Sequence, residues 1–123
     1  MKNKIRLLNV FAILLVVTIC LVIQSASFAG QTIRVKYRDT TVALSSFEYQ
    51  DTSESSWIRG IWYDRENEYL IINLNGTNYH YCGVSEDVWG YLKNYSRHGS
   101  YGRAYNVHLK GNYDCRLGYV PEY

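Results

Sequence analysis

Apolar and polar residues alternate along three stretches in the middle of the chain, and this pattern predicts three β-strands. The stretches cover residues 57–63, 68–74 and 77–84. Alternation with a period of two is typical of a strand that buries one face. The pair Asn75-Gly76 stands directly between the second and third stretches. It favours a tight two-residue hairpin, because both residues tolerate positive φ. The three stretches are therefore expected to form an antiparallel meander.

The two-residue hairpin also predicts which side chains share a face of the sheet. Leu74 then faces Thr77, and the pairing continues along both strands. One face is expected to carry Leu70, Ile72, Leu74, Tyr79 and Tyr81, and the other Tyr69, Ile71, His80 and Cys82. The first set is the better core face. We expect a structural aromatic core there, made of Tyr79, Tyr81, Trp89 and Tyr105.

Two short helices are predicted after the meander. The first follows Ser85, a good N-cap residue, and ends near Asn94. The second runs from Tyr101 to Lys110, where apolar residues recur at four-residue spacing, and Gly111 terminates it. Both helices are expected to pack on the core face of the sheet.

Two shorter runs before the meander predict an N-terminal hairpin. Residues 32–37 alternate, residues 41–44 form a second short strand, and residues 50–54 are a polar linker. We expect residues 30–50 to shield the second face of the sheet. The predicted fold is α+β: a three-stranded antiparallel meander with two short helices on one face, plus an N-terminal β-hairpin extension.

The first 29 residues predict a removable signal peptide. Three basic residues precede an apolar run over residues 10–23, and Ser27 and Ala29 supply the small residues of a cleavage site. This order is typical of a secretory signal. We expect cleavage after Ala29 and an exported protein, periplasmic or secreted.

Two alternatives for this segment are weaker. As an uncleaved membrane anchor, a run of 14 apolar residues would span about 21 Å, which is short of the roughly 30 Å of a bilayer's hydrocarbon. Lipid attachment at Cys20 is disfavoured because Ile19 is bulky where a bacterial lipobox has a small residue.

Removal of this segment changes the charge. Three of the thirteen Lys and Arg residues leave with it, so ten remain against eleven Asp and Glu, a net charge of −1. A global basic field that would steer the protein to nucleic acid is thereby excluded. The remaining 94 residues suffice for one domain with a modest core.

Two cysteines remain, Cys82 and Cys115, and an oxidising compartment favours a disulfide between them. Closing this 33-residue separation would stabilise the fold by about 3.5–4 kcal/mol in the chain-entropy model. Because Cys82 is predicted on the second face, the tail after Gly111 must pass around the edge of the sheet. A β-bulge at Gly83 would ease this path.

Two chemical alternatives involve the same residues. His80 and Cys82 could form a nucleophile pair, but no orienting group stands beside them. A zinc site of His80, Cys82, His108 and Cys115 lacks the usual ligand spacing. We therefore expect no catalytic residue, no metal and no cofactor, and do not expect an enzyme.

Positive charge gathers between residues 93 and 116, where five Lys and Arg stand against one Asp. This surplus suggests a site for an anion or an acidic partner. Its candidate residues are Arg97, Arg103, Asn106, His108, Lys110 and Arg116. The alternative is a solvated helix face.

A resemblance adds to these patterns. The residues that carry it are Ser55-Ser56-x-Ile58, Tyr63-Asp64, Leu70, Gly76, Tyr79-His80-Tyr81, Val84, Leu92, Ser100-Tyr101-Gly102, Tyr105-Asn106 and Leu109-Lys110. In this order and spacing they resemble the KTSC domain, which occurs at the C-terminus of some lysyl-tRNA synthetases and as stand-alone bacterial proteins. The resemblance implies a KTSC-like domain at residues 55–113, an extension and linker at 30–54 and a C-terminal tail at 114–123.

The wider chain resembles exported KTSC proteins through residues 35–38, 79–82 and 114–116. That group often has two further cysteines, which would fall at Tyr49 and Trp62. The resemblance thus implies the loss of one bridge as a pair and supports pairing of the two cysteines that remain. It implies little chemistry, since the family's function is unknown and RNA binding is a suggestion from its synthetase context.

Three functional hypotheses follow. The first is an exported, non-catalytic binding or structural module with an unknown partner. The second is a nucleic-acid or polyanion binder that uses residues 93–116. The third is an enzyme whose site no motif reveals. Full exposure of the Tyr79 and Tyr81 phenols would favour a ligand-stacking role over a structural one.

Overall fold

The computed structural model describes residues 2–23, 30–95 and 99–123. The elements, in chain order, are α1 (Lys2–Ile23), β1 (Thr32–Ile33), β2 (Val42–Ala43), β3 (Glu48–Gln50), β4 (Ile58–Asp64), β5 (Tyr69–Leu74), β6 (Thr77–Cys82), α2 (Glu86–Lys93) and α3 (Tyr101–His108). This is the expected α+β fold. The predicted cleavage site lies outside the described residues.

The main sheet has four antiparallel strands in the order β3-β4-β5-β6. The predicted pairing of β5 with β6 is confirmed, because Leu74 faces Thr77, Ile72 faces Tyr79 and Leu70 faces Tyr81. The sheet also has one strand more than the three predicted. Strand β3 is only three residues long, and so short a strand leaves too little alternation in the sequence to be recognised.

Strand β3 joins the sheet through an aromatic pair. Tyr49 lies directly opposite Trp62 on β4, and their ring centroids are 5.3 Å apart. These are the two positions where the resemblance to exported KTSC proteins places a second pair of cysteines. Cross-strand neighbours are close enough for a disulfide or a ring contact, and in this chain the two rings make the contact.

The N-terminal hairpin is present but shorter than predicted, with two residues in each strand. The chain leaves the hairpin after Ile33 and follows the outer edge of β6, where the Lys36 amide donates to the Asn78 carbonyl at 2.8 Å. Tyr37 then turns the chain with a φ of 69°. The prediction of a strand over residues 32–37 was therefore wrong after Ile33, because pairing with β6 replaces pairing within the hairpin.

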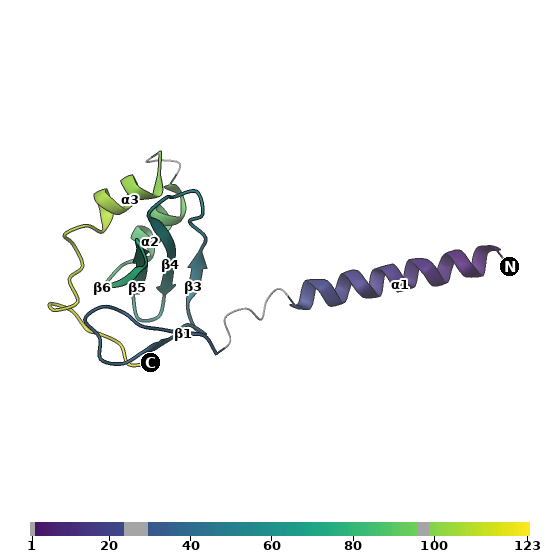
Figure 1. Cartoon of the computed structure of the whole chain (residues 1–123), viewed down its shortest axis with the longest axis horizontal. Coiled ribbons are helices and arrows are strands. Elements are labelled where there is room, and N and C mark those ends of the chain that lie inside the picture. The colour runs from purple at the N-terminus through teal and green to yellow at the C-terminus, as the bar shows by residue number, and fades with distance from the viewer. Residues whose placement is uncertain (1, 24–29, 96–98) are drawn as a thin grey trace.

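The sheet has an apolar cluster on each face, as the alternation predicted. The helix-covered cluster contains buried Ile58, Ile61, Tyr63, Leu70, Ile72, Val84, Val88, Trp89, Leu92, Tyr101, Ala104, Tyr105 and Leu109. The second cluster contains Val35, Val42, Leu44, Tyr69, Ile71, Cys82 and Cys115. In Figure 1, α2 and α3 lie on one side of the sheet, while the hairpin and the C-terminal tail lie on the other.

Both helices after the sheet begin at a serine. The Ser85 hydroxyl accepts from the Val88 amide, which confirms the predicted N-cap of α2. The Ser100 hydroxyl accepts from the Arg103 amide at 3.1 Å and caps α3. Helix α3 ends at His108, two residues before the predicted end at Lys110.

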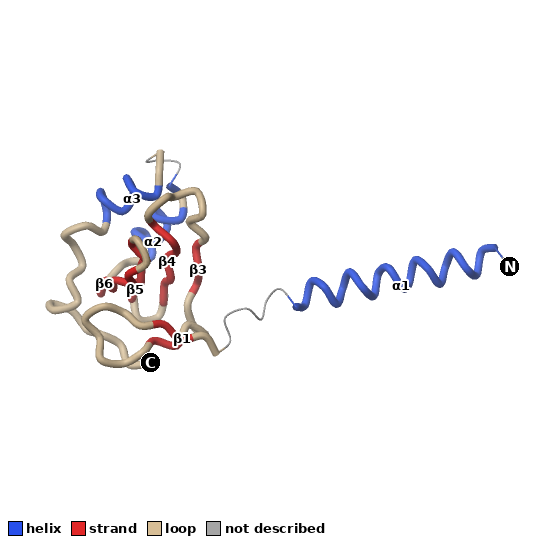
Figure 2. The backbone as a smooth tube through the Cα atoms, in the orientation of Figure 1, coloured by secondary structure: helices blue, strands red, loops and turns tan. Residues whose placement is uncertain are grey.

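The N-terminal helix α1 differs from α2 and α3 in having no buried residue among its described side chains. Its described side chains are exposed and mostly apolar, among them Leu7, Leu8 and Phe11. Within the described part of the chain, no helix has both the length and the apolarity needed to cross a membrane. Figure 2 shows how much of the remaining chain is loop, above all the extension before β3 and the tail after α3.

The pairing irregularity of the sheet lies at Gly60 in β4, between Ile58 and Ile61, and not at Gly83. Gly60 has a φ of 147°, and a Cβ there would lie 3.0 Å from the Trp62 ring and 3.1 Å from the Tyr49 ring. A residue without a side chain is required because the aromatic pair lies over its backbone.

We expect Gly60→Ala to destabilise the fold by about 1–3 kcal/mol, because it adds backbone strain and displaces the Tyr49–Trp62 pair. Gly90→Ala is the matched control, since Gly90 lies in α2 with open space around it. It should stabilise the fold by up to about 1 kcal/mol through helix propensity. Urea denaturation measures both changes, and equal stability of the two variants would contradict the role assigned to Gly60.

Candidate functional site: a cleft beside strand β6

The candidate site is a cleft of about 690 Å³ beside β6, the last strand of the sheet. Three parts of the chain form it: the turn at Tyr37, the middle of β6 and the segment after α3. The lining residues are Tyr37, Tyr79, His80, Tyr81, Gly111, Asn112, Asp114, Cys115 and Arg116. Aromatic rings and a few polar groups at a concave surface are typical of ligand sites.

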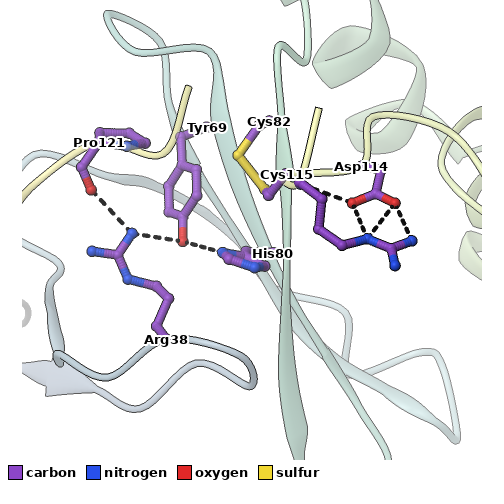
Figure 3. Close-up of a disulfide and its surroundings, with 8 residues drawn as sticks. Arg38, Tyr69, His80, Cys82, Asp114, Cys115 and Pro121 are labelled. Atoms are coloured by element: carbon purple, nitrogen blue, oxygen red, sulfur yellow. Dashed lines mark hydrogen bonds and ion pairs between the residues drawn. A yellow bond between two sulfur atoms is a disulfide. The ribbon is translucent and has the colours of Figure 1, made fainter. Parts of the chain in front are cut away.

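A disulfide joins β6 to the tail at this cleft. Cys82 and Cys115 are bonded, with their Cα atoms 4.8 Å apart (Figure 3). Beside the bond, the Cys82 amide donates to the Tyr113 carbonyl at 2.9 Å. The tail therefore passes around the edge of the sheet, as the position of Cys82 predicted, and forms one wall of the cleft.

The end of the tail is held by polar contacts. Arg38 donates to the Pro121 carbonyl at 3.0 Å, and the Tyr123 hydroxyl donates to Asp64 at 2.6 Å. Asp64 is buried and also accepts from the Asn67 side chain. Burial and the adjacent carboxylate both raise the pKa of the Tyr123 phenol. These bonds and the disulfide fix the tail at Cys115, Pro121 and Tyr123.

A chain of hydrogen bonds sets the state of His80 beneath the cleft (Figure 3). Arg38 donates to the Tyr69 hydroxyl at 3.3 Å, and that hydroxyl lies 2.9 Å from His80 Nδ1. A guanidinium can only donate, so the Tyr69 oxygen accepts from Arg38 and its own proton is available for Nδ1. This network assigns the imidazole proton to Nε2.

The His80 ring is also held neutral. Burial lowers its pKa, and the charge of Arg38 lowers it further. Burial likewise raises the pKa of the Tyr69 phenol. At neutral pH the pair is therefore uncharged, and His80 presents a hydrogen-bond donor at Nε2.

Asp114 and Arg116 form an ion pair at the cleft, with Nη2 and Oδ2 2.6 Å apart. The Arg116 hydrogen bonds lower the pKa of Asp114 to about 2, so both groups are charged at neutral pH. The Arg116 side chain is 88% exposed. The pair marks the polar side of an otherwise aromatic cleft.

The residues predicted to bind an anion do not share one pocket. Arg116 lines the cleft, whereas Asn106 and Lys110 line a separate groove of about 550 Å³ with Trp57, Tyr79, Tyr81 and Tyr105. Arg103 is exposed on α3, and the His108 ring stacks on Tyr91 with 4.7 Å between centroids. Arg97 lies outside the described residues.

Tyr79 and Tyr81 are half-buried and border both the cleft and the groove. Both pack against the helix-covered cluster, in which Trp89 and Tyr105 are buried. The Tyr81 hydroxyl lies 3.2 Å from the Tyr105 hydroxyl, and burial raises the pKa of the Tyr81 phenol. Their rings thus support the core with one side and line the two hollows with the other.

Sequence reasoning missed Tyr37 and Arg38 as parts of the site. Tyr37 is 80% exposed at the cleft, and Arg38 holds Tyr69 and the tail. Both residues belong to the Val-Lys-Tyr-Arg opening of residues 35–38, but no local sequence pattern places this segment beside β6. The alternative zinc site of His80, Cys82, His108 and Cys115 is not assembled, because the disulfide occupies both sulfur atoms.

We expect the neutral His80 to make stability depend on pH. Its folded pKa lies below the ordinary value of 6.5, so below pH 6.5 the unfolded chain binds the proton more readily. The free energy of unfolding should then decrease as the pH falls through this window and be insensitive to His80 above it. Denaturation between about pH 5 and pH 8 should show a shallower dependence for His80→Gln. An unchanged slope in His80→Gln would contradict the assignment.

Comparison with known proteins agrees with the motifs. The family model of the KTSC domain matches residues 54–113, from the residue before Ser55 to the residue after Asn112. No curated protein and no solved structure matches the chain. The match covers β4, β5, β6, α2 and α3 and leaves out Tyr37, Asp114 and Arg116. Residues 54–113 of the chain are therefore a KTSC domain.

Proposed function

We propose that the chain is an exported, non-catalytic binding module that takes its ligand in the cleft beside β6. The proposal rests on which segments of the chain form the walls of the cleft. Tyr37 and Asp114–Arg116 come from segments outside the KTSC match, and both segments are bonded to the edge of β6. The parts that this chain adds to the domain thus build a concave surface on it.

The state of the polar groups supports binding without catalysis. Cys82 is oxidised in the disulfide, and His80 Nδ1 is occupied by the Tyr69 hydroxyl. The Asp114 carboxylate is engaged by Arg116 through two of its nitrogen atoms. Each candidate nucleophile or base of the cleft therefore has a structural partner, whereas the rings and the backbone face the hollow.

The N-terminus supports export. Its described side chains are exposed and mostly apolar, and the basic start and small residues before Gly30 complete the pattern of a signal peptide. The disulfide fits an oxidising compartment. Residues 1–29 would then be absent from the working protein.

The groove on the other side of β6 favours a second candidate, a polyanion binder. Lys110 lies there beside Trp57, Tyr79 and Tyr105. A cation next to aromatic rings is an arrangement that single-stranded nucleic acids use. Burial of Tyr105 and its ring contact with Trp57, 5.6 Å between centroids, leave less ring surface for stacking.

For export, we expect residues 1–29 to direct a fused alkaline phosphatase, which needs disulfides for activity, out of the cytoplasm. Leu14→Arg should abolish the activity, because a charge in the apolar run costs about 2.5–3.5 kcal/mol in insertion. Asn9→Arg, outside that run, should leave it intact. N-terminal sequencing of the natural product should begin at Gly30, and an uncleaved, membrane-bound product would contradict the proposal.

For binding, we expect an immobilised protein, isolated from its producing cells, to retain a component of the compartment outside the cytoplasmic membrane. Tyr37→Ala should lose most of this retention, since a buried aromatic contact commonly contributes 2 kcal/mol or more, roughly a thirtyfold loss of affinity. Tyr119→Ala is the matched control, because Tyr119 is 72% exposed and lies outside the cleft. Retention that charge reversal at Arg103 and Lys110 abolishes and Tyr37→Ala spares would favour the polyanion candidate.

A further inference from the structure

Strand β6 ends the sheet, so its outer edge carries backbone groups that β5 does not use. Two segments occupy parts of this edge. The Lys36 amide donates to the Asn78 carbonyl at 2.8 Å, and the Cys82 amide donates to the Tyr113 carbonyl at 2.9 Å. In an antiparallel ladder, outward-pointing residues alternate. His80, midway between Asn78 and Cys82, therefore also points its N–H and C=O away from β5.

The outward groups of His80 face the cleft. Among the described residues, no backbone group outside the β5–β6 ladder bonds to them. Tyr79 and Tyr81 lie on the helix-covered face of β6 and His80 on the other, yet all three line the same cleft. A hollow lined from both faces of one strand lies over the edge of that strand.

The free part of the edge has the length of a short peptide. Asn78 and Cys82 are separated by about 13 Å, at roughly 3.3 Å per residue along a strand. Lys36 occupies one end of this interval and Tyr113 the other. About three residues of an extended segment fit between them. One residue opposite His80 can accept its N–H and donate to its C=O, as in other additions of a peptide to a sheet edge.

The charges around the cleft favour an acidic side chain on that segment. The Lys36 ammonium lies 5.0 Å from the centroid of the Tyr37 ring and 5.3 Å from that of Tyr79, the two rings that line the cleft near it. Arg116 supplies a second cation, and Asp114 neutralises one of the two. The charge of Lys36 and that of Arg38 beneath the cleft remain, so an acidic occupant is electrostatically complementary.

We propose that the cleft binds an extended, acidic peptide segment of a partner protein, about three residues long, which pairs with the backbone of His80 as a short strand beside β6. The proposal rests on the proposed function, because it uses the same cleft. It assigns recognition to the backbone edge, with the rings and Lys36 selecting the side chains.

The test is a titration of the 15N-labelled protein, isolated from producing cells, with acetyl-Thr-Glu-Thr-amide, followed by NMR. We expect the amide resonance of His80 to shift and its hydrogen exchange to slow as the new bond forms. The same peptide with an N-methyl group on the glutamate nitrogen cannot donate to the His80 carbonyl. It should bind about tenfold more weakly, as the loss of one hydrogen bond predicts. Acetyl-Thr-Lys-Thr-amide should also bind more weakly, because its charge repels Lys36.

Each other result overturns the inference in a recognisable way. Equal binding of the methylated and unmethylated peptides would mean that the cleft holds peptides without strand pairing, and the proposed function would stand. No shift at His80 with millimolar acidic peptide, together with Tyr37-dependent retention of a cell component, would point to a ligand of another class. Shifts that depend on protein concentration without peptide would indicate a second copy of the chain at the edge. Absence of both peptide binding and Tyr37-dependent retention would remove the cleft as a site.

Discussion

The bond between Cys82 and Cys115 joins the last strand of the sheet to the tail, and most of the second face depends on it. Without this link, the tail that carries Arg116, Pro121 and Tyr123 would be held by noncovalent contacts alone, which are the hydrogen bonds at Pro121 and Tyr123 and the packing of the Tyr123 ring against Phe47 and Tyr69. With it, the tail closes over Tyr69 and Ile71, which are fully buried although they lie on the face away from the helices. A small domain with a limited core gains most from a covalent link of this kind.

Strand β5 shows what the link makes possible. Its first four residues are buried on both sides, Leu70 and Ile72 under the helices and Tyr69 and Ile71 under the hairpin and tail. The KTSC match contains the helix-covered side of this arrangement, and the segments outside the match supply the other side. The same segments bond to two ends of the β6 edge and leave its middle facing a cleft. Stability of the second face and formation of the cleft therefore have one structural cause.

The Arg38–Tyr69–His80 chain places a polar network within this apolar second face. Hydrogen bonds join all three side chains, although the buried Arg38 Nε has no partner among the described residues, and the network keeps the imidazole neutral beneath the cleft. A neutral ring does not repel the nearby cations of Arg38, Lys36 or Arg116. The cleft thereby combines a surplus of positive charge with uncharged donors and aromatic walls, which suits recognition of a ligand more than chemical attack on it.

Local patterns in the sequence determined the meander, its register, the division of its faces and the N-cap at Ser85. Each of these features depends on residues that are close together in the sequence. At Asn75-Gly76, for example, the positive φ values of the two-residue turn fix which residues of β5 and β6 pair. The disulfide could also be anticipated, because two cysteines remained once a signal peptide was set aside. Only the tertiary structure decided the rest. Strand β3, the path of residues 34–38 along β6 and the joining of Tyr37 with Arg116 at one cleft are long-range pairings. Such contacts are selected by the packing of whole segments, which no local periodicity encodes.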